Sequence, residues 1–156
     1  MTKVESGYPL TEDASLPRMR LRRASIADAD KLAALAAGAG TPDARQLSER
    51  IEHGGALYYE ADQGPLSLIS WRDVAGGWDL AECSAVGGED VQGHTRWLMT
   101  EVEALAIRLN VPRLSVTPSD EDGAARYRRM GYEPDADNSG RLSKRVGGQW
   151  QFRAAA

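Results

Sequence analysis

Glu82 is the side chain that the sequence places best for proton chemistry. It lies within residues 78–86, an apolar segment predicted to be a β-strand. Alternate residues of a strand share a face, so Glu82 is expected beside Trp78 and Leu80. Partial burial would raise the pKa of this carboxyl group and let it accept a proton, directly or through a water molecule. An exposed carboxylate at the sheet edge is the alternative. Weaker candidates for the same role are Asp79, His94 and His53.

A glycine-rich turn at residues 87–93 follows this strand and leads into a long amphipathic helix. The first backbone N–H groups of a helix lack partners within it and carry the positive end of its dipole. The turn can therefore hold an anionic cofactor with little help from side chains. A helix start that contains glycine and binds no ligand is the alternative.

Cys83 is the only cysteine of the chain, and we expect it to serve in packing. It should point to the opposite face from Glu82, and no neighbour in the sequence lowers the pKa of its thiol. A single cysteine excludes an intramolecular disulfide, which suits a reducing cytoplasm. No histidine and cysteine stand at the spacing of metal ligands, so no metal is expected.

The overall charge and the apolar runs exclude several classes of function. The formal net charge is −4 and the pI about 5.2, which argues against nucleic acid as the main partner, because phosphate binding needs a basic face. The apolar runs are too short to span a membrane, and residues 1–17 lack the apolar core of a signal peptide. We therefore expect a cytoplasmic protein that binds neither nucleic acid nor membrane.

Strands and helices alternate along one expected domain, residues 19–146. The strands are predicted at 20–24, 56–61, 66–72, 78–86 and 113–117, from 132, and at 141–146. The helices are predicted after a Ser25 cap up to Gly38, from Thr41-Pro42 up to Gly54, from about Thr95 up to Pro112, and just before Gly131. Short turns between the strands of residues 56–86 predict an antiparallel meander, and Leu98, Val102, Leu105 and Leu109 predict one buried helix stripe. The order β-α-α-β-β-β-α-β-α-β-β predicts an α/β fold with a crossover helix in its second half.

The two ends differ from this domain. Residues 1–18 mix polar residues, glycine and proline without periodicity, so we expect a flexible leader. Residues 147–156 form a tail in which Trp150 and Phe152 alternate. Two aromatic side chains on one face of an extended segment are expected to dock, on this domain or on a partner chain such as a second copy.

The order of elements and three segments resemble the GNAT superfamily of N-acetyltransferases over roughly residues 19–146. The segments are Gly93-His-Thr-Arg-Trp-Leu-Met, Val111-Pro-Arg-Leu-Ser-Val and Ala124-Ala-Arg-Tyr-Arg-Arg-Met-Gly-Tyr-Glu-Pro134. The resemblance implies a mixed, mostly antiparallel central sheet flanked by helices. In that family, the strand before the long helix splays from its neighbour, and acetyl-CoA lies in the gap.

The resemblance also implies where acetyl-CoA would be held. The family's pyrophosphate loop, Gln/Arg-x-x-Gly-x-Gly/Ala, falls on residues 90–95; Gly93 matches it, whereas Asp90 and Thr95 depart from it. By position, the implied contacts are Val86, Val91, Gln92, Gly93, His94, Thr95, Arg96 and Asp120. For Asp120 the alternative is a helix N-cap, and for His94 it is polar surface.

Tyr127 occupies the place of the family's proton donor, ahead of Gly131 and Tyr132. The resemblance implies that its phenol protonates the departing thiolate of CoA. A core tyrosine packed on an amphipathic helix is the alternative. The basic cluster beside it, Arg126, Arg128 and Arg129, could approach the phosphates of CoA or could face solvent.

The implied function is transfer of an acetyl group from acetyl-CoA to a primary amine by direct attack, with Glu82 as the base and Tyr127 as the acid. The acceptor can be a small molecule or a protein amine. A surplus of acids favours a cationic acceptor; these are Glu60, Asp62, Asp73, Asp79 and Glu82. The alternative is a catalytically weak GNAT-fold module that acts in acyl-CoA sensing or protein interaction.

Overall fold

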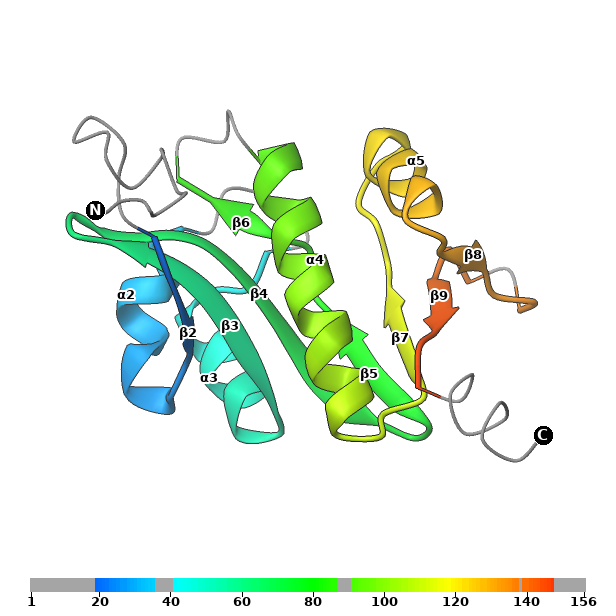
Figure 1. The fold of residues 1–156 in the computed structure, drawn as a ribbon, viewed down its shortest axis with the longest axis horizontal. Coiled ribbons are helices and arrows are strands. Elements are labelled where there is room, and N and C mark those ends of the chain that lie inside the picture. Colours follow the sequence, from blue (N-terminus) through cyan, green and yellow to red (C-terminus); the bar gives the residue numbers. More distant parts are fainter. Residues whose placement is uncertain (1–18, 36–40, 87–90, 138, 148–156) are drawn as a thin grey trace, which may run out of the picture.

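Strands and helices alternate along the chain in the order that the sequence predicts (Figure 1). The structure is a computed structural model that describes residues 19–35, 41–86, 91–137 and 139–147. The strands are β2 Arg20–Arg23, β3 Gly54–Ala61, β4 Gly64–Val74, β5 Gly77–Leu80, β6 Ser84–Ala85, β7 Arg113–Val116, β8 Glu133–Pro134 and β9 Leu142–Arg145. The helices are η1 Ile26–Asp28, a 3₁₀ turn, α2 Ala29–Ala33, α3 Ala44–Glu52, α4 Val91–Arg108 and α5 Glu121–Arg129. The expected leader, the end of the tail and the acidic part of the glycine-rich turn lie outside the described residues.

The described strands form one mixed sheet in the order β2-β3-β4-β5-β7-β9-β8, with β6 paired to β4. Neighbouring strands run antiparallel except for β5 and β7, which run parallel. The parallel pair is possible because α4 carries the chain across the sheet between the two strands. The predicted mixed, mostly antiparallel sheet flanked by helices is therefore confirmed.

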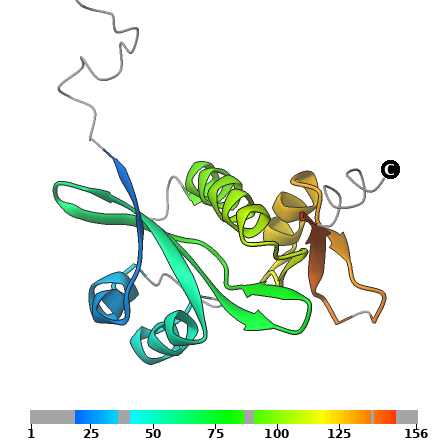
Figure 2. The same cartoon turned by 60° about the horizontal axis from the view of Figure 1, so that its bottom comes forward.

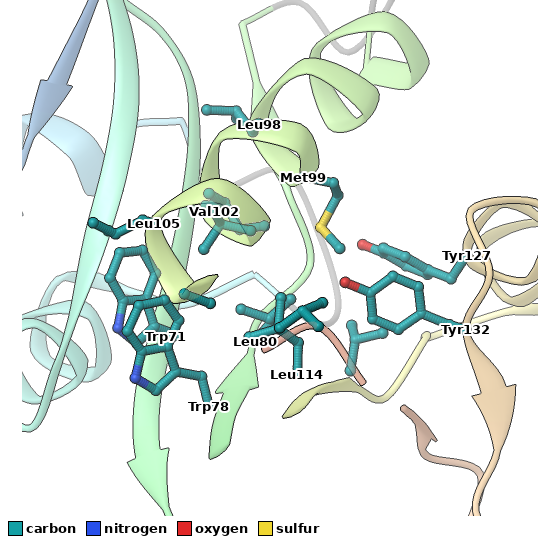
Figure 3. Close-up of a cluster of buried hydrophobic side chains, with 14 of the residues drawn as sticks. Trp71, Trp78, Leu80, Leu98, Met99, Val102, Leu105, Leu114, Tyr127 and Tyr132 are labelled. Atoms are coloured by element: carbon teal, nitrogen blue, oxygen red, sulfur yellow. The ribbon is translucent and has the colours of Figure 1, made fainter. Parts of the chain in front are cut away.

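Helices cover both faces of the sheet. The view in Figure 2 shows α4 and α5 on one face and α2 and α3 on the other. The larger core lies under α4 and α5, where Trp71 of β4 stacks on Trp78 of β5 with ring centroids 4.5 Å apart (Figure 3). A smaller core lies under α2 and α3 around Leu32, Leu47 and Tyr58.

Three predicted helix boundaries are wrong in detail. The helix predicted from the Ser25 cap up to Gly38 is a 3₁₀ turn followed by α2, which ends at Ala33. Helix α3 begins at Ala44 rather than at Thr41-Pro42, because Asp43 forms a capping box: its carboxylate accepts from the Gln46 N–H at 2.8 Å, and the Gln46 side chain accepts from the Asp43 N–H at 3.0 Å. Helix α4 begins at Val91, one turn earlier than expected.

The predicted buried stripe of α4 holds for its first three members and fails for the fourth. Leu98, Val102 and Leu105 are buried, whereas Leu109 is 51% exposed. Leu109 lies beyond the last residue of the helix, and Asn110 follows it in the left-handed region at φ 61°. The chain therefore turns away before Leu109 can continue the helical face.

Candidate functional site

The candidate site lies where the parallel strands β5 and β7 part. They pair as far as Leu80 and Val116, and β6 then pairs with β4 while the chain after β7 leads to α5. The intervening residues 81–83 are not in strand conformation, so the predicted strand 78–86 is in fact two strands. Backbone bonds from Ala81 N–H to the Ser70 carbonyl at 2.9 Å and from Val86 N–H to the Leu66 carbonyl at 2.8 Å hold this segment to β4. Crevices at the carboxyl ends of parallel strands are common binding places.

Glu82 lies in that irregular segment, half-buried, with its carboxylate against the start of α5. A Cβ atom on Gly123 would lie 3.0 Å from Glu82 Oε2 and 3.3 Å from Asp120 Oδ1, so Gly123 leaves the room that both carboxylates use. The positive end of the α5 dipole favours negative charge there. Glu82 therefore faces α5, on the side of the sheet where Trp78 and Leu80 are buried.

Tyr127 lies on α5, about one turn after Gly123, and is only 1% exposed. Its hydroxyl points toward α4 (Figure 3), and the backbone of Cys83 forms a hydrogen bond with it. Burial raises the pKa of Tyr127 well above its usual range, and the negative charge of Glu82 raises it further. The phenol is thus protonated at neutral pH, as a proton donor must be. Tyr127 also belongs to the main core, so the packing alternative describes its side chain, and its role as a proton donor stays a prediction.

The strand alternation predicts that Cys83 points to the face opposite Glu82, but in the structure both side chains lie on the same face. The Cys83 thiol interacts with Thr95 on α4, which covers the same face as α5 (Figure 2). The prediction is wrong because residues 81–83 break the period of two. Burial raises the pKa of the Cys83 thiol to about 11, which agrees with a packing role.

The start of α4 gathers most of the residues predicted to hold the cofactor. Val91, Gln92 and Gly93 form the first turn of the 18-residue helix rather than a loop before it. The backbone N–H groups of that turn are therefore the donors that this end offers to an anion. The side chains differ in what they can reach: Val86 and Arg96 are exposed, whereas Thr95 is buried.

His94 is not polar surface, the alternative considered for it. It is 7% exposed, and its ring meets Tyr59 of β3 at 6.5 Å and Trp97 at 5.5 Å in edge-to-face contacts. The side chain therefore packs between α4 and the sheet. Position 94 falls three residues before Trp97 on the same helical face, a spacing that could have indicated this contact.

Asp120 is the N-cap of α5. Its Oδ1 accepts a hydrogen bond from the Gly123 N–H at 2.8 Å, which satisfies one of the free donors of the helix start. The capping alternative therefore describes this side chain.

Sequence reasoning missed a second group of polar residues on the opposite face of the sheet. Arg50 of α3 and Arg72 of β4 line a cavity of about 300 Å³, together with Thr41, Pro42, Gln46, Glu49 and Ala81. Arg50 stands three residues after the buried Leu47, so the helical period could have placed it on the inner face of α3.

Within the described part of the chain, no three His, Cys, Asp or Glu side chains come together as metal ligands would. In the same residues, we find no helix with the length and apolarity needed to cross a membrane.

No family model and no curated protein sequence matches the chain. Solved structures do resemble it. An IAA acetyltransferase from Bacillus cereus is 14% identical, with a TM-score of 0.66 over 83% of this chain and all of that one. A GNAT family N-acetyltransferase from Escherichia coli in complex with CoA is 16% identical, with a TM-score of 0.65 over 84% of this chain and 83% of that one. A GNAT family acetyltransferase from Brucella melitensis in complex with acetyl-CoA is 17% identical, with a TM-score of 0.60 over 85% and 90%. The chain therefore has the GNAT fold.

Proposed function

We propose that this protein transfers an acetyl group from acetyl-CoA to a primary amine. The observation that carries the proposal is the parting of β5 and β7 in a GNAT fold. Glu82 belongs to the segment where they part, and the Tyr127 hydroxyl lies beside the next residue of that segment, Cys83. Solved structures with this fold include acetyltransferases that hold CoA or acetyl-CoA. A base and an acid close to one another are what direct transfer between two substrates requires.

Acetyl-CoA would supply the acetyl group as a thioester, in which sulfur is the leaving atom. As the amine nitrogen bonds to the carbonyl carbon and the carbon–sulfur bond breaks, Glu82 takes a proton from the nitrogen and Tyr127 gives one to the sulfur. Backbone N–H groups of the segment that leads to Val86 would stabilise the negative charge on the carbonyl oxygen. The products are an amide and a thiol, and no bond to the enzyme forms.

The residues at this opening suit an anionic co-substrate. The first turn of α4 places backbone N–H groups at the positive end of the helix dipole and includes a glycine, Gly93. Arg126 of α5 adds a cation whose charge is felt at both Tyr127 and Cys83. Its Nε is buried and has no hydrogen-bond partner among the described residues. A buried donor without a partner is rare in native proteins and calls for an explanation.

The test is turnover with acetyl-CoA and a panel of amines: amino acids, polyamines and a lysine-containing peptide. We expect at least one amine to release CoA thiol faster than the uncatalysed reaction, with the matching acetamide identified by mass spectrometry. Folded protein that binds acetyl-CoA and releases no thiol with any amine would instead support the non-catalytic module.

A further inference from the structure

We propose that the acceptor amine carries an anionic group, a carboxylate or phosphonate, which binds to Arg50 and Arg72 in the cavity between α3 and β4. This inference rests on the proposed acetyl transfer and names the class of its second substrate. A cavity of about 300 Å³ suits a small molecule rather than a folded protein surface.

The two arginines have donors to spare inside this cavity. Nη2 of Arg50 donates to the Asp79 carbonyl at 2.5 Å, and Nη2 of Arg72 donates to a carboxylate oxygen of Glu49. The Nε atoms of both arginines are buried, so the donors left for a ligand in the cavity are the remaining Nη groups. A guanidinium has five N–H donors in a rigid fork that matches the oxygens of a carboxylate or phosphonate. Two such forks on one cavity therefore predict an anionic ligand.

The carboxylates near the two arginines do not supply acceptors for all of the guanidinium donors. The Glu49–Arg72 pair is exposed, with 53% and 42% of the side chains accessible, and an exposed pair contributes little stability. Asp79 Oδ2 lies 3.9 Å from Arg50, beyond hydrogen-bond range. The pKa of Arg50 is lowered, first by burial and then, against the pull of Asp79, by the like charge of Arg72. An anion between the two guanidinium groups would relieve that repulsion.

Two of the five acids that suggested a cationic acceptor, Glu60 and Asp62, are paired elsewhere. Glu60 lies 2.5 Å from Arg22, 3.8 Å from Arg20 and 3.6 Å from Lys31, on the far strands of the sheet. Asp62 also pairs with Arg20, at 3.7 Å. These carboxylates are therefore neutralised by protein cations instead of facing the cavity.

The cavity also borders the irregular segment, residues 81–83, that contains Glu82. Ala81 lines it and directly precedes Glu82 in the chain. Asp79 faces Arg50 on α3, whereas Leu80 is buried under α4, so neighbouring residues of this segment face the cavity side and the core side of the sheet. In this proposal the anionic group lies between Arg50 and Arg72 on the α3 side, with the amine directed past Ala81 toward Glu82.

The first experiment compares acceptors that differ only in the anion. Proteinogenic L-amino acids are tested against their α-carboxamides, aminoethylphosphonate against ethanolamine, and spermidine serves as the cationic acceptor. With acetyl-CoA fixed, we expect kcat/KM for the preferred acid to exceed that of its amide by on the order of tenfold or more, since hydrogen bonds to charged groups are the stronger ones. The carboxylate and phosphonate arms show which anion the cavity takes. Equal turnover of acids and neutral counterparts, or a preference for spermidine, overturns the inference.

The second experiment removes the donors. Arg72→Gln should raise the acceptor KM and bring the acid-to-amide ratio close to one, while the KM for acetyl-CoA stays unchanged. Arg45→Gln, an exposed arginine on the same helix as Arg50, is the matched control and should keep the preference. Arg50→Lys provides a second variant that keeps the charge and loses the fork. An Arg72→Gln enzyme that folds and keeps the full acid preference contradicts the proposal.

Thermal unfolding with the same acids and amides, without acetyl-CoA, separates this inference from the proposed function. Acids should raise the Tm of the wild type and of Arg45→Gln, and amides should not. If no amine releases thiol but this Arg72-dependent shift is found, the anion site stands and acetyl transfer fails. If thiol is released and acids shift the Tm no more than amides, acetyl transfer stands and the anion site is refuted.

Discussion

Tyr127 and Tyr132 form a matched pair that separates catalysis from packing. Both are 1% exposed, and their rings meet edge to face at 6.0 Å, with both hydroxyls pointing toward α4 (Figure 3). They differ in the hydroxyl partner: Tyr127 meets the backbone of Cys83, and Tyr132 donates to a carboxylate oxygen of Glu103 at 3.0 Å. We therefore expect Tyr127→Phe mainly to lose activity and Tyr132→Phe mainly to lose stability.

The size of each effect follows from these partners. Tyr127→Phe keeps the ring and loses a bond to a neutral group, which costs about 0.5–1.5 kcal/mol of unfolding free energy. Tyr132→Phe loses a bond to a charged group, which costs about 1.5–3 kcal/mol. At about 2–4 °C per kcal/mol for a domain of this size, Tyr132→Phe should have the lower Tm. Removing a proton donor should reduce kcat by about 100-fold or more, and only Tyr127→Phe does so.

The assay is CoA thiol release at saturating acetyl-CoA and amine, with Tm from calorimetry on the same samples. We expect Tyr127→Phe to lose kcat and keep most of its stability, and Tyr132→Phe to lose stability and keep kcat within about threefold, under 1 kcal/mol of activation free energy. Equal kcat values for Tyr127→Phe and wild type would refute the acid role and leave Tyr127 as a core residue.

Three further predictions concern the same opening. Glu82→Gln should reduce kcat by about 100-fold or more and remove the limb of the pH–rate profile that reports deprotonation of the base; an unaltered profile would assign the base to another group. Gly123→Ala should raise helix stability by up to about 1 kcal/mol, yet lower kcat, because the new Cβ would lie 3.0 Å from Glu82 Oε2. A Gly123→Ala variant as active as the wild type would argue that Glu82 takes no part in the reaction. With a thiol pKa of about 11, native Cys83 should react with iodoacetamide at pH 8 on the order of 100-fold more slowly than in unfolded protein, and similar rates would contradict its burial.

Much of the fold could be predicted because its elements carry local signals. Apolar spacing and glycine or proline stops mark most helices and strands, and the segment up to Pro134 places Tyr127 on the last helix. The break at residues 81–83 has no such signal. It arises because Leu80 pairs with Trp71 and Ser84 pairs with Leu68, so four steps along this segment oppose three steps along β4 and one residue bulges out. The pairing of Leu80 with Val116 of β7 adds a further constraint from far along the chain. The faces predicted for Cys83 and Glu82 assumed an unbroken strand. The prediction is therefore wrong for Cys83, although Glu82 lies on the predicted face.

The acceptor side could not be predicted for a related reason. Arg50 and Arg72 are ordinary charged residues in the sequence, one on a helix and one on a strand, and only the packing of α3 on β4 places them on the same cavity. His94 shows the same effect on a smaller scale, since its burial depends on Tyr59 of a distant strand. Local patterns thus predicted the elements, and tertiary contacts decide which charged groups meet.

The central claim is that the opening between β5 and β7 binds acetyl-CoA. Titration of the wild-type protein with acetyl-CoA, followed by thermal unfolding, tests it most directly. A ligand at a hundred times its Kd adds about 2.7 kcal/mol of stability, which corresponds to roughly 5–10 °C here. We predict a saturable rise in Tm of that size and its reproduction by CoA. A folded protein whose Tm does not change at millimolar acetyl-CoA would contradict the claim.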